Sequence, residues 1–320
     1  MPKTKPVRKG AAMIQNEKPP RYRILWFFAL GIAVLASGAV VLIHLRNMPQ
    51  GNPVTDSPAP SYDYPLQTGE EVIDRVILFS DSGVTITALA LGFSSDHMPY
   101  IATAVENTCE VEIIPQVSYC AINGVAMRAH MDMNPTVPAG ETVFCRLQVD
   151  DPFFAYAGFV RIENLQIELS FSDAETDALL STDTHMHEIT FSDAYEPFRA
   201  ENLSDALPLD TENDYKIYYA GSSDLNSDHI LDFIFYIECF DTAPIYFESG
   251  ELFVNGIMQS DYAFGVIAPG NGSFVAIACD DDSIHEHGIS DATIRFTFFD
   301  ENYNLIYESE ELSFIGDSLL

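Results

Sequence analysis

Ile122-Asn123-Gly124-Val125 places an Asn-Gly pair between two apolar residues, and the chain repeats the pattern later as Val254-Asn255-Gly256-Ile257. Because Asn and Gly both accept positive φ, such a pair between apolar runs predicts a two-residue β-hairpin turn. When the two motifs are aligned, the same register places Asp96-His97 on Asp228-His229. We therefore predict an internal repeat in which each copy contains this hairpin.

Short runs rich in Val, Ile, Phe and Tyr, broken by Gly, Asn, Asp and Pro, surround the first hairpin and predict β-strands. In the run Leu165–Phe171, apolar residues alternate with Gln166, Glu168 and Ser170, as in a strand with one buried and one solvated face. Runs that follow one another at intervals of about ten residues are typical of an antiparallel sandwich. The other strands predicted in the first copy are Val72–Phe79, Val84–Leu91, Tyr100–Asn107, Val111–Ala121 and Thr142–Val149.

The predicted fold class is all-β, with two tandem immunoglobulin-like antiparallel β-sandwiches after an N-terminal transmembrane helix and a Pro-rich stalk. The first sandwich is expected at residues 70–192 and the second at 213–320, with an acidic linker at 193–212. Asp151-Pro152 precedes the last strands of the first copy and favours one or two helical turns.

The N-terminal region contains a 22-residue apolar run, Ile24–Leu45, with His44 as its only ionisable residue. That length spans roughly 30 Å of hydrocarbon as a helix. The basic tail at residues 1–23 predicts, by the positive-inside rule, a cell-membrane protein with a single span, a cytoplasmic N-terminus and extracytoplasmic C-terminal domains. A cleaved signal peptide is the alternative. Residues 46–69, rich in Pro, are predicted to form an extended stalk.

The chain is strongly acidic, with a net charge of −33. Beyond the apolar run, residues 46–320 hold 8 basic and 47 acidic residues, which makes nucleic acid and anionic lipid poor partners. The chain contains five cysteines, and an odd number cannot form a complete set of intramolecular disulfides. We predict buried free thiols, with a single bridge such as Cys109–Cys120 as the alternative.

The order of basic tail, apolar span, Pro-rich stalk and two sandwiches with Asn-Gly turns resembles anchored extracytoplasmic immunoglobulin-like proteins of Gram-positive bacteria. The resemblance covers residues 24–316 and implies fold and topology. It departs from true immunoglobulin domains in lacking their Cys…Trp…Cys signature, because the only Trp is Trp26. Most proteins of this kind have no assigned function, so the resemblance supplies no catalytic residues.

The segment from Asp224 to Asp232 has the spacing D-x-N-x-D-x-x-x-D, which resembles a calcium-binding loop. It departs from such loops at the sixth position, where His229 stands in place of Gly, and at the twelfth, where Phe235 replaces a bidentate Glu. The predicted calcium ligands are Asp224, Asn226, Asp228 and Asp232. The alternative is a polar hairpin loop.

Two further groups of residues suit other metals. Asp183, His185 and His187 share one face of a strand and could meet a zinc or copper ion, with His285-Glu286-His287 as a weaker echo. Met127, His130, Met131 and Met133 could suit a soft metal such as Cu(I). In each case, solvated or gap-filling side chains are the alternative.

No nucleophile elbow, zinc-protease motif, P-loop or dinucleotide fingerprint occurs in the sequence. We therefore predict a non-enzymatic, membrane-anchored surface protein whose tandem domains bind or scaffold an unknown extracytoplasmic protein or envelope component. The alternative is a calcium- or metal-dependent binding module, and a cell-envelope enzyme is the third class. No cofactor is predicted apart from calcium at the loop described above.

Overall fold

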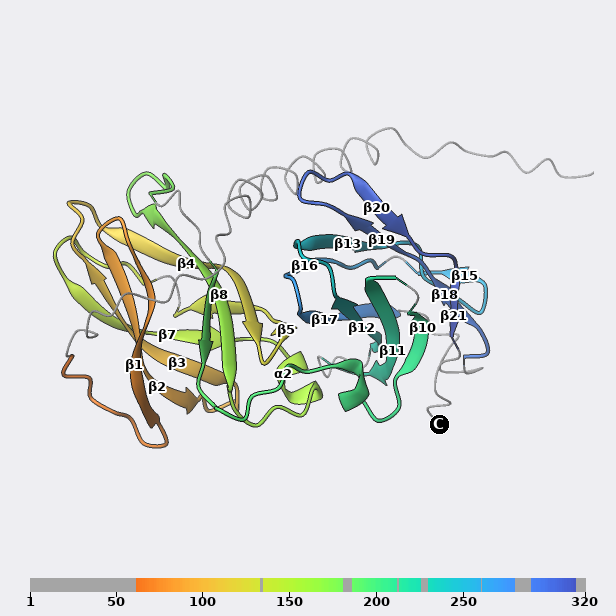
Figure 1. The fold of residues 1–320 in the computed structure, drawn as a ribbon, viewed down its shortest axis with the longest axis horizontal. Helices are drawn as coiled ribbons and strands as arrows, with labels where there is room; N and C mark the ends of the chain where they lie inside the picture. The colour runs from red at the N-terminus through yellow and green to blue at the C-terminus, as the bar shows by residue number, and fades with distance from the viewer. Residues whose placement is uncertain are drawn as a thin grey trace, which may run out of the picture. The chain divides into compact units, whose positions relative to one another are not determined.

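The computed structural model describes residues 62–132, 135–180, 186–211, 213–225, 230–259, 261–279 and 289–314 (Figure 1). The described chain is all-β and forms several sheets, consistent with a β-sandwich, which confirms the predicted class. Its helical elements are α2 (Phe153–Tyr156) and a 3₁₀ turn, η1 (Ala200–Asn202). We call residues 62–206 the N-terminal half and residues 207–314 the C-terminal half.

Sheet A lies in the N-terminal half and is coloured orange to yellow-green in Figure 1. Its strands are antiparallel, as expected for a chain that alternates short apolar runs with turns. In spatial order they are β1 (Glu71–Asp81), β2 (Val84–Phe93), β3 (Pro99–Asn107), β7 (Thr142–Val149) and β6 (Ala129–Met131).

Sheet B contains strands from both halves of the chain. The C-terminal half contributes β10 (Leu207–Asp210), β11 (Tyr215–Ser223), β12 (Leu231–Cys239) and β17 (Gly272–Cys279). The N-terminal half continues the sheet with β5 (Val125–Ala126), β4 (Ile113–Ile122), β8 (Asn164–Asp173) and β9 (His187–Thr190). The halves are therefore joined through one sheet.

Two smaller sheets complete the C-terminal half. In spatial order, sheet C consists of β16 (Phe264–Ile267), β13 (Ile245–Ser249), β19 (Phe296–Phe299) and β20 (Leu305–Glu308). Sheet D consists of β15 (Ile257–Met258), β14 (Phe253–Val254), β18 (Ala292–Ile294) and β21 (Leu312–Phe314).

Both Asn-Gly pairs form hairpin turns with positive φ, at 53° and 84° for Asn123 and Gly124 and at 50° and 78° for Asn255 and Gly256. The first turn connects β4 to β5 and the second connects β14 to β15. Each Asn side chain also holds a neighbouring loop: Asn123 Oδ1 accepts the N–H groups of Glu163 and Asn164, at 2.8 and 3.0 Å. Asn255 Oδ1 accepts those of Ser290 and Asp291, at 2.9 and 3.3 Å.

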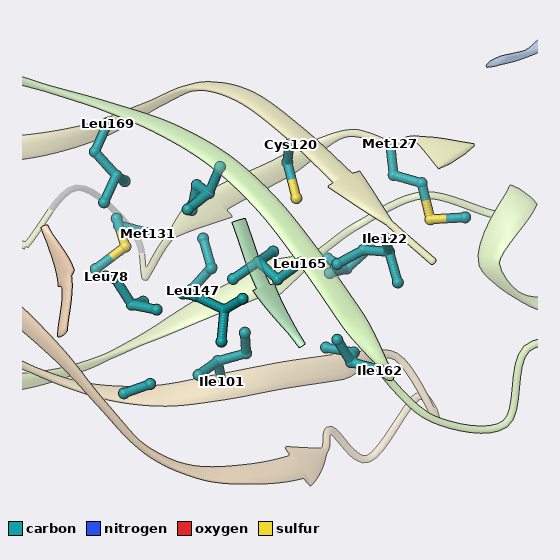
Figure 2. Close-up of a cluster of buried hydrophobic side chains, with 14 of the residues drawn as sticks. Leu78, Ile101, Cys120, Ile122, Met127, Met131, Leu147, Ile162, Leu165 and Leu169 are labelled. Atoms are coloured by element: carbon teal, nitrogen blue, oxygen red, sulfur yellow. The ribbon is translucent and has the colours of Figure 1, made fainter. Parts of the chain in front are cut away.

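The core of the N-terminal half lies between sheet A and the β4–β8 part of sheet B. Figure 2 shows Leu165 on β8 gathered with Ile101 and Leu147 from sheet A, and all three are fully buried. Met127 and Met131 fill the same core. Alternation along β8 therefore gives the buried face that the sequence predicts. The predicted solvated face is wrong, because Glu168 is 1% and Ser170 is 7% exposed. Residues of the C-terminal half reach this face, where Asn271 donates to Gln166.

Strand β12 is buried on both faces. Its residues Phe233 and Phe235 belong to the core of the C-terminal half, whereas Ile234 and Tyr236 belong to the core of the N-terminal half, together with Phe274 from β17. Full burial of an apolar side chain stabilises the fold by roughly 1.5–3 kcal/mol. The contact between the halves is therefore part of the hydrophobic core.

The segment predicted as a linker, residues 193–212, contains η1 and β10. Phe198 and Ala200 are buried in the core of the N-terminal half, and β10 pairs with β11 of the C-terminal half. The acidic composition of this segment did not predict these contacts, because Phe198 and Ala200 are its only buried side chains among the described residues.

The structure contradicts the predicted location as a single-pass membrane protein. Across the residues that it describes, no helix is long and apolar enough to cross a membrane, and α2 has four residues. On this finding the predicted location is wrong. The predicted tail at 1–23, the span Ile24–Leu45 and the stalk up to residue 61 lie outside the described residues.

Candidate functional site

The two halves meet where β5 lies between β4 and β17. Val125 and Ala126 pair in parallel with Gly272 and Ser273, and the Gly272 N–H donates a 2.8 Å hydrogen bond to the carbonyl of Gly124. Since β5 has only two residues, β4 and β17 continue past this pairing with no other described strand between them.

A groove of about 510 Å³ opens beside this joint. Three strands line it with edges that are wholly or partly free among the described strands: β4 near Ser118, β17 near Ala276 and β16 near Phe264. β16 pairs only with β13 in that part of the chain. The groove therefore presents backbone edges as well as side chains.

The groove lining is mostly apolar and aromatic, with Met127, Phe153 and Val266 among its residues. At its lip, Tyr262 and Phe264 are 52% and 60% exposed, and their rings stack with centroids 6.3 Å apart. An exposed aromatic pair beside an open strand edge is a feature of surfaces that bind other molecules.

Arg128 and Asp151 supply the charges of the groove. Asp151 is buried, and burial raises the pKa of its carboxyl group, against the opposing effect of two backbone hydrogen bonds. Its oxygens accept the N–H of Arg128 at 2.8 Å and that of Phe153 at 2.9 Å, which fixes the start of α2 beside the groove. The Arg128 side chain stays exposed and donates from Nε to the carbonyl of Asp150 at 2.8 Å.

Aromatic stacking makes one wall of the joint rigid. Phe153 on α2 stacks on Phe274 of β17 with ring centroids 5.2 Å apart, and Phe198 lies edge-on to Tyr236 of β12 at 5.4 Å. Each such pair contributes about 0.5–1.5 kcal/mol beyond its burial.

Polar bonds hold the other wall of the joint. The Tyr119 hydroxyl accepts the Ala268 N–H at 3.3 Å and the Asn271 Nδ2 group at 3.2 Å. Asn271 also donates to Gln166 at 2.6 Å. These bonds fix β4 and β8 against the turn before β17, so the groove has a defined width.

The chemistry of the groove suits binding. Cys120 lines it, but burial raises the pKa of its thiol to about 12, so the sulfur carries its proton at neutral pH. A protonated thiol is a poor nucleophile. The remaining lining offers apolar contact and backbone hydrogen bonds.

The structure describes two of the four predicted calcium ligands, Asp224 and Asp232. Asp232 lies on β12, is 5% exposed and accepts the Leu225 N–H at 3.1 Å, and Asp224 is exposed nearby. Asn226 and Asp228 lie outside the described residues, so the calcium site stays a prediction. Within the described chain, no group of three or more His, Cys, Asp or Glu side chains could hold a metal ion.

The structure describes four of the other predicted metal ligands, namely Met127, His130, Met131 and His187. Met127 and Met131 are core residues, whereas His130 is exposed. His187 lies on β9 with its ring 6.0 Å from that of Phe79. Met133, Asp183, His185 and His285-Glu286-His287 lie outside the described residues.

The sequence prediction missed Tyr262 and Phe264. Two aromatic residues at positions i and i+2 of a short run point to the same face of a strand. Gly265 follows them, and a Cβ at that glycine would lie 2.6 Å from Cζ of Phe247. An aromatic pair followed by a glycine was the available signal.

No protein-family model matches the chain, and no curated protein matches it. Solved structures similar to it include a protein of unknown function from Porphyromonas gingivalis W83, at 12% identity and a TM-score of 0.21, covering 73% of this chain and 98% of that chain. The YadV chaperone matches at 11% identity and a TM-score of 0.23, and the match covers 73% of this chain and 99% of that chain. The Salmonella enterica SafA pilin in complex with the SafB chaperone matches at 11% identity and a TM-score of 0.21, and the match covers 74% of this chain and 98% of that chain. Similarities this low carry no argument about function.

Proposed function

We propose that this chain is a non-enzymatic binding protein, built from two tandem immunoglobulin-like sandwiches, that holds an extended segment of a partner protein in the groove between its halves. The open strand edges around the groove carry the proposal. An extended peptide that adds to a free edge gains main-chain hydrogen bonds, while pockets for alternate side chains give specificity.

The tandem arrangement rests on matched strand registers. Ile122 faces Leu165 across β4 and β8, and in the second copy Val254 faces Ala292 across β14 and β18. Together with the equivalent Asn-Gly hairpins, these registers support two copies of one sandwich.

The side chains of the groove define the partner's chemistry. Phe264, Tyr262 and Phe153 favour apolar side chains at alternate positions of the bound segment. The net charge of −33 favours Lys and Arg flanking that segment, because opposite charge speeds encounter. The predicted partner is therefore a basic polypeptide with an alternating apolar stretch.

A selection of random peptides displayed on phage against the full chain tests this function. Enriched peptides should combine alternating apolar residues with Lys or Arg, and should bind Phe264→Ser about tenfold more weakly than the parent chain. Leu305→Ser is the matched control, because Leu305 is also 60% exposed on an edge strand, β20. Peptides that bind both variants and the parent equally, or no enrichment, would contradict the proposed function.

A further inference from the structure

The contact between the two halves uses two surfaces. One is the outer edge of the Asn123-Gly124 hairpin, in strand β5, and the other is the start of β17 at Gly272 and Ser273. The two surfaces differ from each other, so the contact is heterologous, and each half is expected to carry a counterpart of both.

In the C-terminal half, no described strand pairs with the outer edge of the Asn255-Gly256 hairpin. β15 pairs with β14 and is an edge strand among the described strands. Ile257 and Met258 are 49% and 54% exposed, whereas the matching Val125 is fully buried. A Cβ on Gly124 would lie 3.2 Å from Pro197, and one on Gly256 would meet nothing within 4 Å.

The N-terminal half presents the other surface. Thr142 and Val143 begin β7 as Gly272 and Ser273 begin β17, at the equivalent place in the repeat. The registers agree, because Thr142 faces Glu106 on β3 and Gly272 faces Glu238 on β12. Among the described residues, β6 pairs with β7 from Leu147 to Val149, and the Asp132 N–H extends this bonding to the carbonyl of Arg146 at 2.8 Å.

Phe144 is the counterpart of Phe274, which is 5% exposed and stacked on Phe153 in the joint. Phe144 is 41% exposed, although Tyr62 and Tyr64 touch it with ring centroids at 6.4 and 5.3 Å. An apolar residue therefore stands beside the Thr142–Val143 edge where the joint uses one.

We propose that copies of this chain associate head to tail, with β15 of one copy pairing in parallel with the start of β7 of the next. A second copy is the occupant because the described part of each chain offers one open edge of each kind, at opposite halves. Heterologous contacts that do not close a ring produce open-ended assemblies.

The hydrogen bonds follow from strand alternation. Val254 and Ile257 face each other across the turn, so the Met258 N–H and the Gly256 carbonyl point away from β14. The Thr142 N–H would donate to the Gly256 carbonyl, as the Gly272 N–H donates to Gly124 within the chain. Repulsion between chains of net charge −33 opposes this contact, and salt screens it.

The test measures the mass of the full chain in solution against concentration, by sedimentation equilibrium at about 0.15 M and about 1 M NaCl. The parent chain should exceed twice its mass of 35.5 kDa at high concentration, more readily at high salt. Met258→Pro removes one outward N–H and Thr142→Pro the other, and each variant alone should remain at the single-chain mass. A mixture of the two variants should form dimers and nothing larger, because each retains one intact edge.

Leu305→Pro on β20 is the control for a proline on an exposed strand, and it should associate like the parent. Urea unfolding checks that each variant is folded, and Ile257→Asp with Val143→Asp provides a second pair that leaves the backbone intact. Association through the apolar run Ile24–Leu45 would persist in every variant. The proposal is overturned if the parent chain stays at the single-chain mass at all concentrations, or if the variants associate as the parent does.

Discussion

Gly272 donates its backbone N–H to the carbonyl of Gly124 across 2.8 Å, and this bond joins the two halves within sheet B. A glycine is required on the β17 side, since a Cβ on Gly272 would lie 2.1 Å from the Tyr236 hydroxyl and 2.3 Å from Cζ of that ring. Close approach of the Tyr236 ring thus sets which residue can stand at the joint.

Gly272→Ala should lower the free energy of unfolding by about 1–3 kcal/mol, because the added methyl group overpacks a buried contact. Urea unfolding monitored by fluorescence measures the loss. In a Tyr236→Leu background the same substitution should cost markedly less, since the obstructing ring is absent. An equal loss in both backgrounds would place the strain elsewhere.

Tyr119→Phe should destabilise the chain by about 1–3 kcal/mol, because it leaves the buried Ala268 N–H without its acceptor. Thermal or urea unfolding measures the change. Tyr262→Phe is the matched control, as its side chain is 52% exposed, and it should leave stability unchanged. Equal stability of the two variants would mean that the hydroxyl of Tyr119 does not hold the joint.

Tyr215 donates from its hydroxyl to Asp241 Oδ2 at 2.8 Å. This bond lowers the pKa of the Asp241 carboxyl group, with help from backbone N–H groups. Its contribution to stability is therefore present above the ordinary carboxyl pKa of about 3.9 and is lost as the pH falls through the lower native pKa. Carboxyl NMR titration should find the low pKa, and Asp241→Asn should flatten stability over that acidic range, whereas an ordinary pKa would refute the assignment.

All five cysteines lie in the described chain and none of them forms a disulfide there, which confirms the prediction that they are thiols. Burial raises the pKa of Cys120 to about 12 and those of Cys145 and Cys239 to about 11. Cys109 is half-buried and donates to the Ser82 carbonyl. A thiol reagent at pH 8 should react readily with Cys109 alone in the folded chain and with five thiols in denaturant, and Cys109→Ser should remove the fast phase.

Local patterns made much of the fold predictable. Positive φ at Asn123 and Asn255 follows directly from the Asn-Gly pairs, and alternation along Leu165–Phe171 indicated the buried face of β8. The junction of the halves was not predicted, because it depends on the outer faces of β12 and β17. The nearly unbroken apolar run Leu231–Cys239 was the signal, since strands buried on both faces read that way.

The groove could not be predicted from single segments. Ser118, Phe264 and Ala276 lie far apart in sequence and meet only because β5 joins β4 to β17 within sheet B. Motif spacing favoured the Asp224–Asp232 segment as a calcium site instead, yet the Asp232 carboxylate accepts a hydrogen bond from the Leu225 N–H. The spacing of residues in a motif predicts only local geometry, whereas the groove depends on the long-range pairing of β5 with β17.

Burial of β12 on both faces has a consequence for synthesis on the ribosome. Phe153 and Phe198 are translated well before Tyr236 and Phe274, which cover them in the finished protein. At roughly 5–20 residues per second, the nascent N-terminal half keeps this aromatic surface uncovered for several seconds. During that interval it is open to factors that attend emerging chains, so the yield of correctly folded protein will depend on translation speed through the segment between Phe198 and Phe274.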